Sequence, residues 1–233
     1  TITSTVQANT TAGFSIITYT GTGSTATIGH GLNSAPEVII TKGRSDTHSW
    51  IVGATADSSD LSKVLVLQTN AASTTATSNY NAAPNSSTYQ VVNAGGTNNN
   101  TDTYVAYVFH SVQGYSKFAS YKGNGNANGP FVYTGFKPAW VMVKKTNGSH
   151  DWYIQYGNTT FDDVSQAVNP VKHSLIANSA NTKATENSMD FLSNGFKLRT
   201  SGNGHNTSGD DYLYMAFAQN PFVNSNGTPS NAH

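Results

Sequence analysis

Short hydrophobic segments separated by polar residues dominate the pattern of the chain. Residues 196–199 alternate apolar and charged side chains, which is typical of a strand with one buried face. Residues 64–67 and 140–143 are continuous apolar runs, and residues 104–109 combine aromatic with β-branched side chains, which favours strands. Helical periodicity is weak throughout, and only residues 164–176 resemble a short helix. The pattern therefore predicts an all-β chain.

Pairs of residues that favour tight turns lie between the predicted strands. They are Gly95-Gly96, Asn124-Gly125, Asn147-Gly148, Asn194-Gly195 and Asn203-Gly204. Many short strands joined by such turns favour antiparallel sheets packed as β-sandwiches.

The same series of segments occurs twice in the chain. Residues 13–23, which begin Gly-Phe-Ser and end Tyr-Thr-Gly-Thr-Gly, recur as residues 114–125, which begin Gly-Tyr-Ser and end Tyr-Lys-Gly-Asn-Gly. Four further matches follow along the chain: 36–42 with 138–144, 48–50 with 150–152, 87–91 with 194–198, and 102–109 with 210–217. We therefore expect two tandem antiparallel β-sandwich repeats of the jelly-roll kind, related by internal duplication.

The matches also set the expected domain boundaries. The first repeat spans residues 13–113 and the second spans 114–223, with an N-terminal arm or linker at 1–12 and a flexible tail at 224–233. We expect the aromatic residues that recur at matched positions to lie in the two cores. They include Tyr104 with Tyr212, and Phe109 with Phe217.

A glycine pattern after a predicted strand raises the question of nucleotide binding. Gly21 and Gly23 follow the β-branched residues 16–18. Gly123 and Gly125 hold the matching positions in the second copy. A phosphate-binding turn needs a helix that begins directly after the glycines, so that free N–H groups point at the anion. The residues that follow here begin helices poorly, so we expect a tight bend with a positive φ angle instead.

Composition narrows the classes of partner. Lys plus Arg and Asp plus Glu both number 12, so the formal net charge is zero, and charged residues make up only 10% of the chain. A nucleic-acid binder usually carries a broad basic surface, so we expect no nucleic-acid partner. No apolar run has the length of a transmembrane helix, so we expect no membrane insertion. The chain has no Cys, which excludes disulfides and thiolate metal sites.

The recurring His-x-Trp sequence is the best candidate for a binding site. It occurs as His48 with Trp50 and as His150 with Trp152. On a strand, a spacing of two places both side chains on one face, where an indole ring could stack on a sugar and an imidazole could bond to its hydroxyl groups. Alternatively, both Trp residues are core anchors with a His at the rim, because Trp is highly buried on average. We favour the core interpretation and retain the four residues as a candidate glycan platform.

Four acidic residues are candidates for metal ligands or catalytic groups. Asp102 and Asp210 lie in Asn- and Gly-rich loops where Ca²⁺ could bind, but no spaced Asp-x-Asp-x-Asp run accompanies them. Asp162 and Asp163 are adjacent and would point apart on a strand, which argues against a glycosidase pair. No nucleophile elbow, phosphate-binding loop or metal spacing of His residues occurs. We therefore expect no cofactor, no metal site and no enzyme activity.

Two blocks near the end of the chain carry a resemblance to a known group of proteins. They are residues 190–199, Asp-Phe-Leu-Ser-Asn-Gly-Phe-Lys-Leu-Arg, and residues 211–222, Asp-Tyr-Leu-Tyr-Met-Ala-Phe-Ala-Gln-Asn-Pro-Phe. Residues 14–21, 28–32 and 129–139 are similar as well. The chain resembles the tandem β-sandwich repeat at the C-terminus of tail-fibre and other virion-associated proteins of tailed, often marine, bacteriophages.

The resemblance implies a non-enzymatic structural protein of the virion, in the tail or a tail fibre, that takes part in host-surface adhesion. Its partners would be other virion proteins, further copies of itself and glycans of the host cell surface, and its location would be extracellular. Two alternatives remain open. In one, the polar and β-branched residues 1–8 add as a strand to a neighbouring subunit in an extracellular filament. In the other, the His-x-Trp residues make the chain a carbohydrate-binding module.

Overall fold

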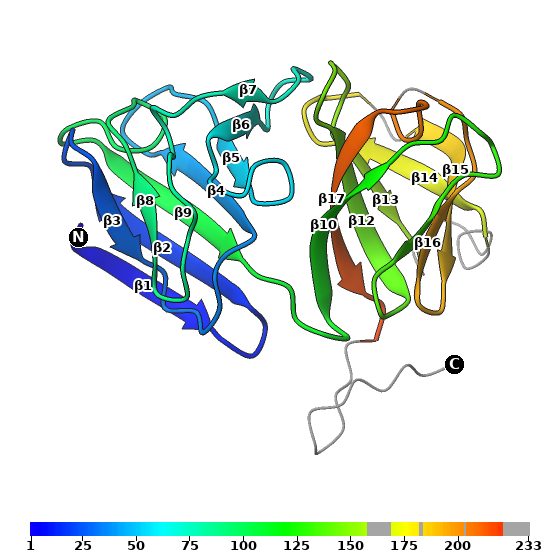
Figure 1. The fold of residues 1–233 in the computed structure, drawn as a ribbon, viewed down its shortest axis with the longest axis horizontal. Helices are drawn as coiled ribbons and strands as arrows, with labels where there is room; N and C mark the ends of the chain where they lie inside the picture. The colour runs from blue at the N-terminus through cyan, green and yellow to red at the C-terminus, as the bar shows by residue number, and fades with distance from the viewer. Residues whose placement is uncertain (158–168, 182–183, 203, 221–233) are drawn as a thin grey trace. The chain divides into compact units, whose positions relative to one another are not determined.

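The chain folds into two compact units in the computed structural model. Unit 1 comprises Thr1–Ser111 and unit 2 comprises Val112–His233. Figure 1 shows unit 1 in blue to green and unit 2 in green to orange. The described residues are 1–157, 169–181, 184–202 and 204–220. These residues form strands and loops and contain no helix, so the all-β prediction is confirmed.

Unit 1 is described in full and contains nine strands. They are β1 (Ser4–Asn9), β2 (Phe14–Thr20), β3 (Ala26–Gly29), β4 (Val38–Gly43), β5 (Ile51–Ala54), β6 (Lys63–Val66), β7 (Thr74–Thr75), β8 (Thr88–Val91) and β9 (Thr103–Phe109). Seven of them form one sheet in the order β1-β2-β9-β4-β5-β6-β7, and β3 pairs with β8 in a second sheet. The paired strands are antiparallel in both sheets.

The core of unit 1 lies between its two sheets. Burial alternates along β2 and β9, so that Ile17, Tyr104 and Val108 point to the interior. Ile28 of β3 and Tyr89 of β8 belong to the same buried cluster. The alternation follows from the two-residue period of a strand, and it leaves unit 1 with two packed layers.

The described part of unit 2 forms one sheet of eight strands. They are β10 (Ser116–Lys122), β11 (Phe131–Tyr133), β12 (Pro138–Lys145), β13 (Tyr153–Tyr156), β14 (Val171–Ile176), β15 (Ala184–Leu192), β16 (Gly195–Leu198) and β17 (Asp211–Ala218). Their order is β10-β17-β12-β13-β14-β15-β16-β11. The paired strands are again antiparallel.

The sheet of unit 2 curls around its own core. Val141 of β12 and Tyr214 of β17 belong to one buried cluster with Met189 of β15 and Phe196 of β16. Strands from opposite ends of the sheet therefore pack against each other, which requires a strongly twisted sheet. The pair β11–β16 is joined to the main sheet through β15, whereas the corresponding pair β3–β8 of unit 1 forms a sheet of its own.

Three segments bear on the sequence-based expectations. The helix expected at 164–176 is wrong where it can be compared, because Val171–Ile176 form strand β14 between β13 and β15, and residues 164–168 lie outside the described part of the chain. Periodicity cannot tell a short buried strand from a short helix, and here the neighbouring strands decide. Residues 1–12, expected to be an arm or linker, include strand β1, which pairs with β2. The tail expected at 224–233 lies outside the described residues.

The recurring aromatic residues divide between two faces of the sheets. Tyr104 and Tyr212 are fully buried in the cores, as expected. Phe109 and Phe217 are only half-buried, so the expectation that they lie in the cores is wrong. Each Phe lies an odd number of positions from its Tyr along the same strand, and successive side chains of a strand point to opposite faces. Phe109 contacts Phe14 instead, with 4.8 Å between ring centroids.

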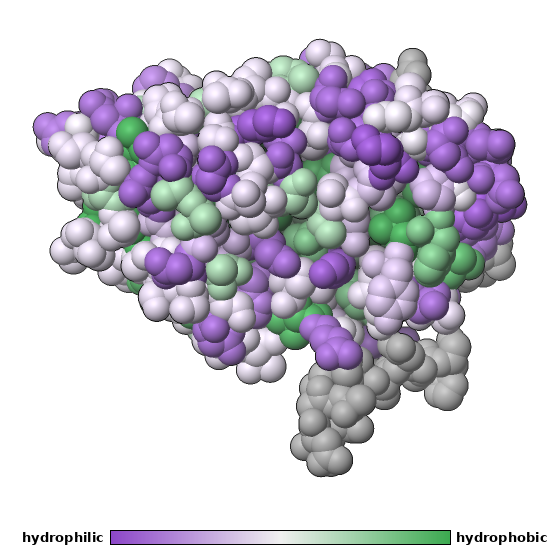
Figure 2. Space-filling model, viewed as in Figure 1, coloured by the Kyte–Doolittle hydropathy of each residue, from purple (hydrophilic) through white to green (hydrophobic). Residues whose placement is uncertain are grey.

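The face of the molecule in Figure 2 is mainly hydrophilic or neutral, with smaller hydrophobic areas. Four large hydrophobic side chains are exposed among the described residues: Val6, Phe131, Tyr133 and Leu175. Phe131 and Tyr133 point to the same side of β11, which lies at one edge of the unit 2 sheet. Charged residues make up only 10% of the chain, so neutral polar side chains are expected to provide much of its contact with water.

Candidate functional site

In each unit, a turn that contains two glycines is hydrogen-bonded to a loop far away in the sequence. We call this turn and loop together the corner of the unit. In unit 1 the corner comprises residues 21–24 and 96–102. Gly23 N donates to Asn98 O at 3.1 Å, and Thr22 N donates to Asn98 Oδ1 at 2.8 Å. Asn98 is fully buried, so these bonds hold the loop firmly against the turn.

The corner of unit 2 comprises residues 123–126 and 204–210 and repeats these bonds. Gly125 N donates to Asn206 O at 2.9 Å, and Asn124 N donates to Asn206 Oδ1 at 2.8 Å. The side-chain amide nitrogen of Asn206 also donates to three oxygen atoms at 2.8 or 2.9 Å. A single buried Asn thus organises the corner in both units.

Each corner needs two glycines for two different reasons. A Cβ atom on Gly21 or Gly123 would lie 2.1 Å from a backbone oxygen, so only glycine fits there. Gly23 and Gly125 have φ angles of +66° and +69°, which favour glycine. The predicted positive φ is therefore confirmed for Gly23 and Gly125. Each turn leads into a strand, β3 or β11, so the phosphate-binding alternative lacks the helix it requires.

A buried tyrosine donates a hydrogen bond to the loop of each corner. Tyr19 Oη donates to Thr97 O at 2.5 Å, and Tyr121 Oη donates to His205 O at 2.7 Å. In each unit the tyrosine ring stacks on the tyrosine at the second position of the last strand, Tyr104 of β9 or Tyr212 of β17, with 5.1 Å between ring centroids. Burial raises the pKa of Tyr19 and of Tyr121 well above the usual value, so both remain neutral donors. Thr97 and His205 therefore occupy matched positions in the two corners.

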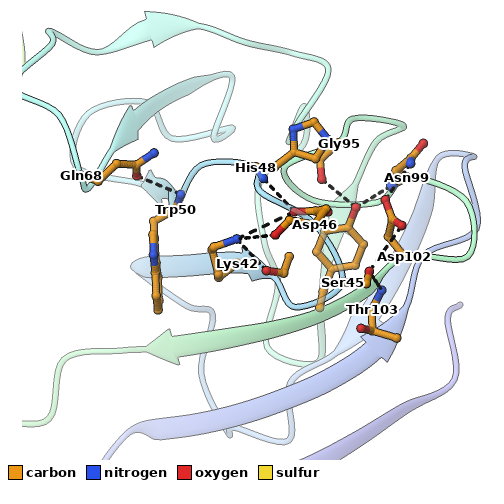
Figure 3. Close-up of polar contacts among 12 residues, drawn as sticks. Lys42, Ser45, Asp46, His48, Trp50, Gln68, Gly95, Asn99, Asp102 and Thr103 are labelled. Atoms are coloured by element: carbon orange, nitrogen blue, oxygen red, sulfur yellow. Dashed lines mark hydrogen bonds and ion pairs between the residues drawn. The ribbon is translucent and has the colours of Figure 1, made fainter.

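The structure does not bring His48 and Trp50 together as one platform. Both lie in the loop that precedes β5 rather than on a strand. The exposed His48 ring packs against Gly95, where a Cβ atom would lie 2.2 Å from Nε2. The half-buried Trp50 ring stacks with Tyr107 at 6.4 Å between centroids. Figure 3 shows the His48 and Trp50 rings pointing in different directions.

Backbone and side-chain bonds fix the loop that carries these two residues (Figure 3). Lys42 Nζ donates to Asp46 O at 3.3 Å and lies 3.8 Å from Asp46 Oδ1. His48 N donates to Asp46 Oδ1 at 2.8 Å, and Trp50 N donates to Gln68 Oε1 at 3.0 Å. The loop is therefore held by internal contacts.

The two aspartates considered for Ca²⁺ make local contacts instead. Asp102 accepts bonds from Ser45 Oγ at 3.4 Å and from Asn99 Nδ2 at 2.7 Å (Figure 3). Asp210 Oδ2 lies 2.5 Å from Lys145 Nζ, and hydrogen bonding to this lysine lowers the pKa of Asp210. Among the described residues, no group of three or more His, Asp or Glu side chains is placed to hold a metal ion. Asp162 and Asp163 lie outside the described part of the chain.

Trp152 and His150 have different environments in unit 2. Trp152 is only 1% exposed, and its N donates to Asn178 Oδ1 at 2.8 Å. Lys144 Nζ lies 6.0 Å from the centre of the Trp152 ring. Trp152 therefore agrees with the core interpretation, whereas the half-buried Trp50 does not. His150 is half-buried at the rim of a cleft.

This cleft has a volume of about 430 Å³ and lies beside the corner of unit 2. Its walls come from the loop before β13, from β13 and β15, and from the loop between β16 and β17. The lining residues are His150, Tyr153, Asn187, Ser188, Thr200, Gly202, Gly204 and His205. The size lies within the range of sites for small molecules.

His205 is a buried titratable group of the cleft. It is 4% exposed, and burial together with the nearby His150 lowers its pKa to about 4. The imidazole is therefore neutral at pH 7. Gln155 Nε2 lies 3.4 Å from His205 Nε2 and donates to it when the His205 proton is on Nδ1.

The Tyr153 ring is held between neighbouring groups of the cleft. Its centroid lies 4.6 Å from that of His205 and 6.5 Å from that of His150. A Cβ atom on Gly204 would lie 2.5 Å from Tyr153 Cε2, so glycine lets the backbone approach the ring. Burial also lowers the pKa of His150, so its imidazole is neutral at pH 7.

Two buried side-chain oxygens near the cleft make no hydrogen bond within the described part of the chain. They are Ser188 Oγ and Gln155 Oε1. Ser188 lines the cleft and is 2% exposed, and Gln155 contacts His205 from the interior. A buried polar atom without a partner costs roughly 1–3 kcal/mol, so a bound group or water that supplies a partner would be stabilising.

Sequence reasoning found His150 but missed Tyr153, Ser188 and His205. The available signal was the difference between the matched segments of the two units rather than their likeness. Tyr153 begins β13 where Ile51 begins β5, and His205 occupies the position of Thr97. At these positions unit 2 has a larger polar or aromatic residue where unit 1 has a smaller or apolar one. Such a difference could have indicated a functional residue.

Comparisons with other proteins identify the family but attach no activity to it. No helix in the part of the chain that is described has the length and hydrophobicity needed to cross a lipid bilayer. No curated protein and no solved structure matches the chain significantly. One family model spans both units: residues 1–221 match it, and the chain belongs to this family, described as a domain of unknown function (DUF7483).

Proposed function

We propose that the protein is a non-enzymatic structural component of a tailed-bacteriophage virion, in the tail or a tail fibre, where it contributes to adhesion to the host surface. Residues 190–199 and 211–222 carry the resemblance to virion-associated proteins. The structural observation that supports it most is the corner built in the same way in two compact units. Loops held by a rigid scaffold are the usual place for binding residues in β proteins.

We also propose that internal duplication produced the two units, and that each is a jelly-roll-like β-sandwich with its repeat beginning near residue 13 or residue 114. The equivalent tyrosine stacks, glycine turns and buried Asn residues support common ancestry. Such agreement in detailed geometry, at positions that also match in sequence, would be hard to reach independently.

Partners in the virion would be other structural proteins and further copies of this chain. The aromatic side chains of Phe131 and Tyr133 are 45% and 65% exposed on the edge strand β11. Exposed aromatic rings beside an unpaired strand edge offer both apolar area and backbone groups to a partner. This edge is where we expect assembly contacts.

The filament alternative receives less support than the virion function. Strand addition between subunits needs a segment that is free to leave its own unit, and β1 pairs with β2 along its whole length. Ile2 N also donates to Thr27 O at 2.7 Å, and Ile2 is 6% exposed. Exchange of this segment would first have to break these contacts.

Mass spectrometry of purified particles, with immunogold electron microscopy using antibodies against this chain, tests the proposed location. We expect peptides from both units and labelling at the tail or fibres. Particles that lack the chain, although the encoding phage expresses it during infection, would overturn the proposal.

A further inference from the structure

The cleft of unit 2 gathers neutral hydrogen-bonding groups beside an aromatic ring. We propose that this cleft binds a neutral saccharide, with His150, Tyr153 and His205 as the principal contacts. The inference deepens the proposed adhesion by naming its ligand class, and it depends on that function only for the source of the saccharide, a bacterial surface.

The charge of the lining determines the class of ligand. None of the lining residues that the structure describes is Asp, Glu, Lys or Arg, and both imidazoles are neutral at pH 7 because burial lowers the pKa of each. Among these described residues, an anionic ligand would find no cationic side chain and a cationic ligand no carboxylate. A neutral ligand rich in hydroxyl groups fits this environment.

The hydrogen-bonding capacity of the lining matches such a ligand. Asn187, Ser188 and Thr200 bring an amide and two hydroxyl groups, each able to donate and accept. Ser188 Oγ is buried and has no hydrogen-bond partner among the described residues. A ligand hydroxyl group that bonds to it would remove the free-energy cost of this unpaired oxygen. Sugar hydroxyl groups also donate and accept, which allows them to satisfy groups of both kinds.

The aromatic wall is built as a fixed surface. Tyr153 is placed by the start of β13, by its contact with the His205 ring at 4.6 Å and by the close approach of Gly204. A ring that is already held in place loses little conformational entropy when a ligand packs on it. The apolar face of a sugar ring is suited to such a surface.

Unit 1 provides an internal comparison for this assignment. At the matched positions it has Ile51 instead of Tyr153 and Thr97 instead of His205. Its third matched residue, His48, packs against Gly95. We therefore assign saccharide binding to unit 2 alone.

The test uses the full chain on an array of neutral oligosaccharides built from glucose, galactose, mannose and N-acetylglucosamine, with uronic-acid oligosaccharides as anionic probes. Hits are measured by calorimetry and by NMR titration at pH 7. We expect neutral oligosaccharides to bind and the shifts to lie at cleft residues. Competition by free monosaccharides would identify a free sugar as sufficient, and its failure would identify a longer surface glycan.

Three variants localise the binding. His150→Ala removes a half-buried rim group, Tyr153→Ile installs the residue of unit 1, and Asn187→Ala shortens an exposed side chain of the lining. The first two should weaken binding at least tenfold, and the third several-fold. His48→Ala, at the matched position of unit 1, is the control and should bind like the wild type.

Three results would overturn the proposal: no neutral oligosaccharide on the array binds, binding is unchanged in all three cleft variants, or the NMR shifts are confined to unit 1. The NMR map of the wild type remains decisive if a variant fails to fold, because shifts confined to unit 1 would also overturn it. Failure here is separable from failure of the virion function. If the chain is present in particles but binds no saccharide, only the saccharide-binding proposal is rejected. If it binds a saccharide but is absent from particles, only the proposed location is rejected.

Discussion

The two corners share one backbone arrangement and differ in the side chains around it. Both join a glycine turn to a loop through a buried Asn, and both end on a tyrosine that donates to a loop carbonyl. Unit 1 surrounds this arrangement with Ile51 and Thr97, whereas unit 2 surrounds it with Tyr153 and His205. The shared residues account for the fold, so the differing residues are where function is to be sought.

A second difference concerns the Trp residue that precedes the matched strands β5 and β13. Trp50 is half-buried and stacks on Tyr107, whereas Trp152 is 1% exposed. The residue matched with Tyr107 is Met215, on β17. The same residue type at the same sequence position thus has a surface role in one unit and an interior role in the other.

The largest expected effect separates these two Trp residues. Trp152→Ala should lower the free energy of unfolding by about 3–5 kcal/mol, because it empties a buried site. Trp50→Ala should cost only about 1 kcal/mol, since its ring is partly in solvent already. Urea denaturation followed by circular dichroism measures both. Equal losses would contradict the assignment of different environments.

The next effect is a pH dependence that only the corner of unit 2 should show. Burial lowers the pKa of His205 from 6.5 to about 4, so the unfolded chain binds the extra proton first as the pH falls. The stabilisation is complete above pH 6.5 and is lost progressively down to about pH 4, by about 3 kcal/mol in total at 1.36 kcal/mol per pKa unit. Denaturation curves between pH 4 and 7 measure this loss.

His205→Thr is the matched variant for this measurement, because it restores the residue that unit 1 has at Thr97. The free energy of unfolding is plotted against pH for wild type and variant. The difference between the two slopes gives the contribution of His205 separately from that of other groups such as His150, whose pKa burial also lowers. Identical slopes would show that His205 is not buried as a neutral group.

A smaller effect tests the likeness of the corners. Gly23→Ala and Gly125→Ala should each cost about 1–2 kcal/mol, because a side chain at positive φ is strained. The added Cβ would lie 2.9 Å from the Cβ of Asn100 or Ser208, so the two sites are equally crowded. Thermal unfolding should give the same loss for both within about 0.5 kcal/mol. A clear inequality would mean that the two turns are not equivalent.

The smallest effect concerns a pair that unit 1 lacks. Lys122 Nζ lies 2.6 Å from Asp211 Oδ1, and the two side chains are 63% and 49% exposed. Unit 1 has Thr20 opposite Thr103 at this register. Lys122→Ala should lower stability by less than about 1 kcal/mol, because exposed ion pairs contribute little. High salt should reduce even this difference, and a loss above 2 kcal/mol would contradict a solvent-screened pair.

The sequence predicted the all-β class because apolar and polar residues alternate with the two-residue period of a strand, as at 196–198 in β16. It also predicted the positive φ of Gly23 and Gly125, since few other residue types adopt that conformation. The strand Val171–Ile176 could not be predicted from the sequence, because its structure depends on pairing with β13 and β15 rather than on its own periodicity.

The candidate site was less predictable than the fold. His48 and Trp50 were expected on a strand, but β5 begins only at Ile51, and element boundaries are set by pairing partners. The residues of the cleft come from segments between 150 and 205 that meet only after the unit 2 sheet has curled. His205 carries no local motif, so its burial beside Tyr153 could not be inferred from spacing.

Strand β1 has a practical consequence for work with shorter chains. The first sequence match begins at residue 13, which makes a truncated protein starting there look like a complete repeat. Such a protein would lack the strand that covers β2, leaving its edge with a row of unpaired backbone amides and carbonyls. Self-association through that bare edge would then imitate an oligomer that the intact chain does not form through β2.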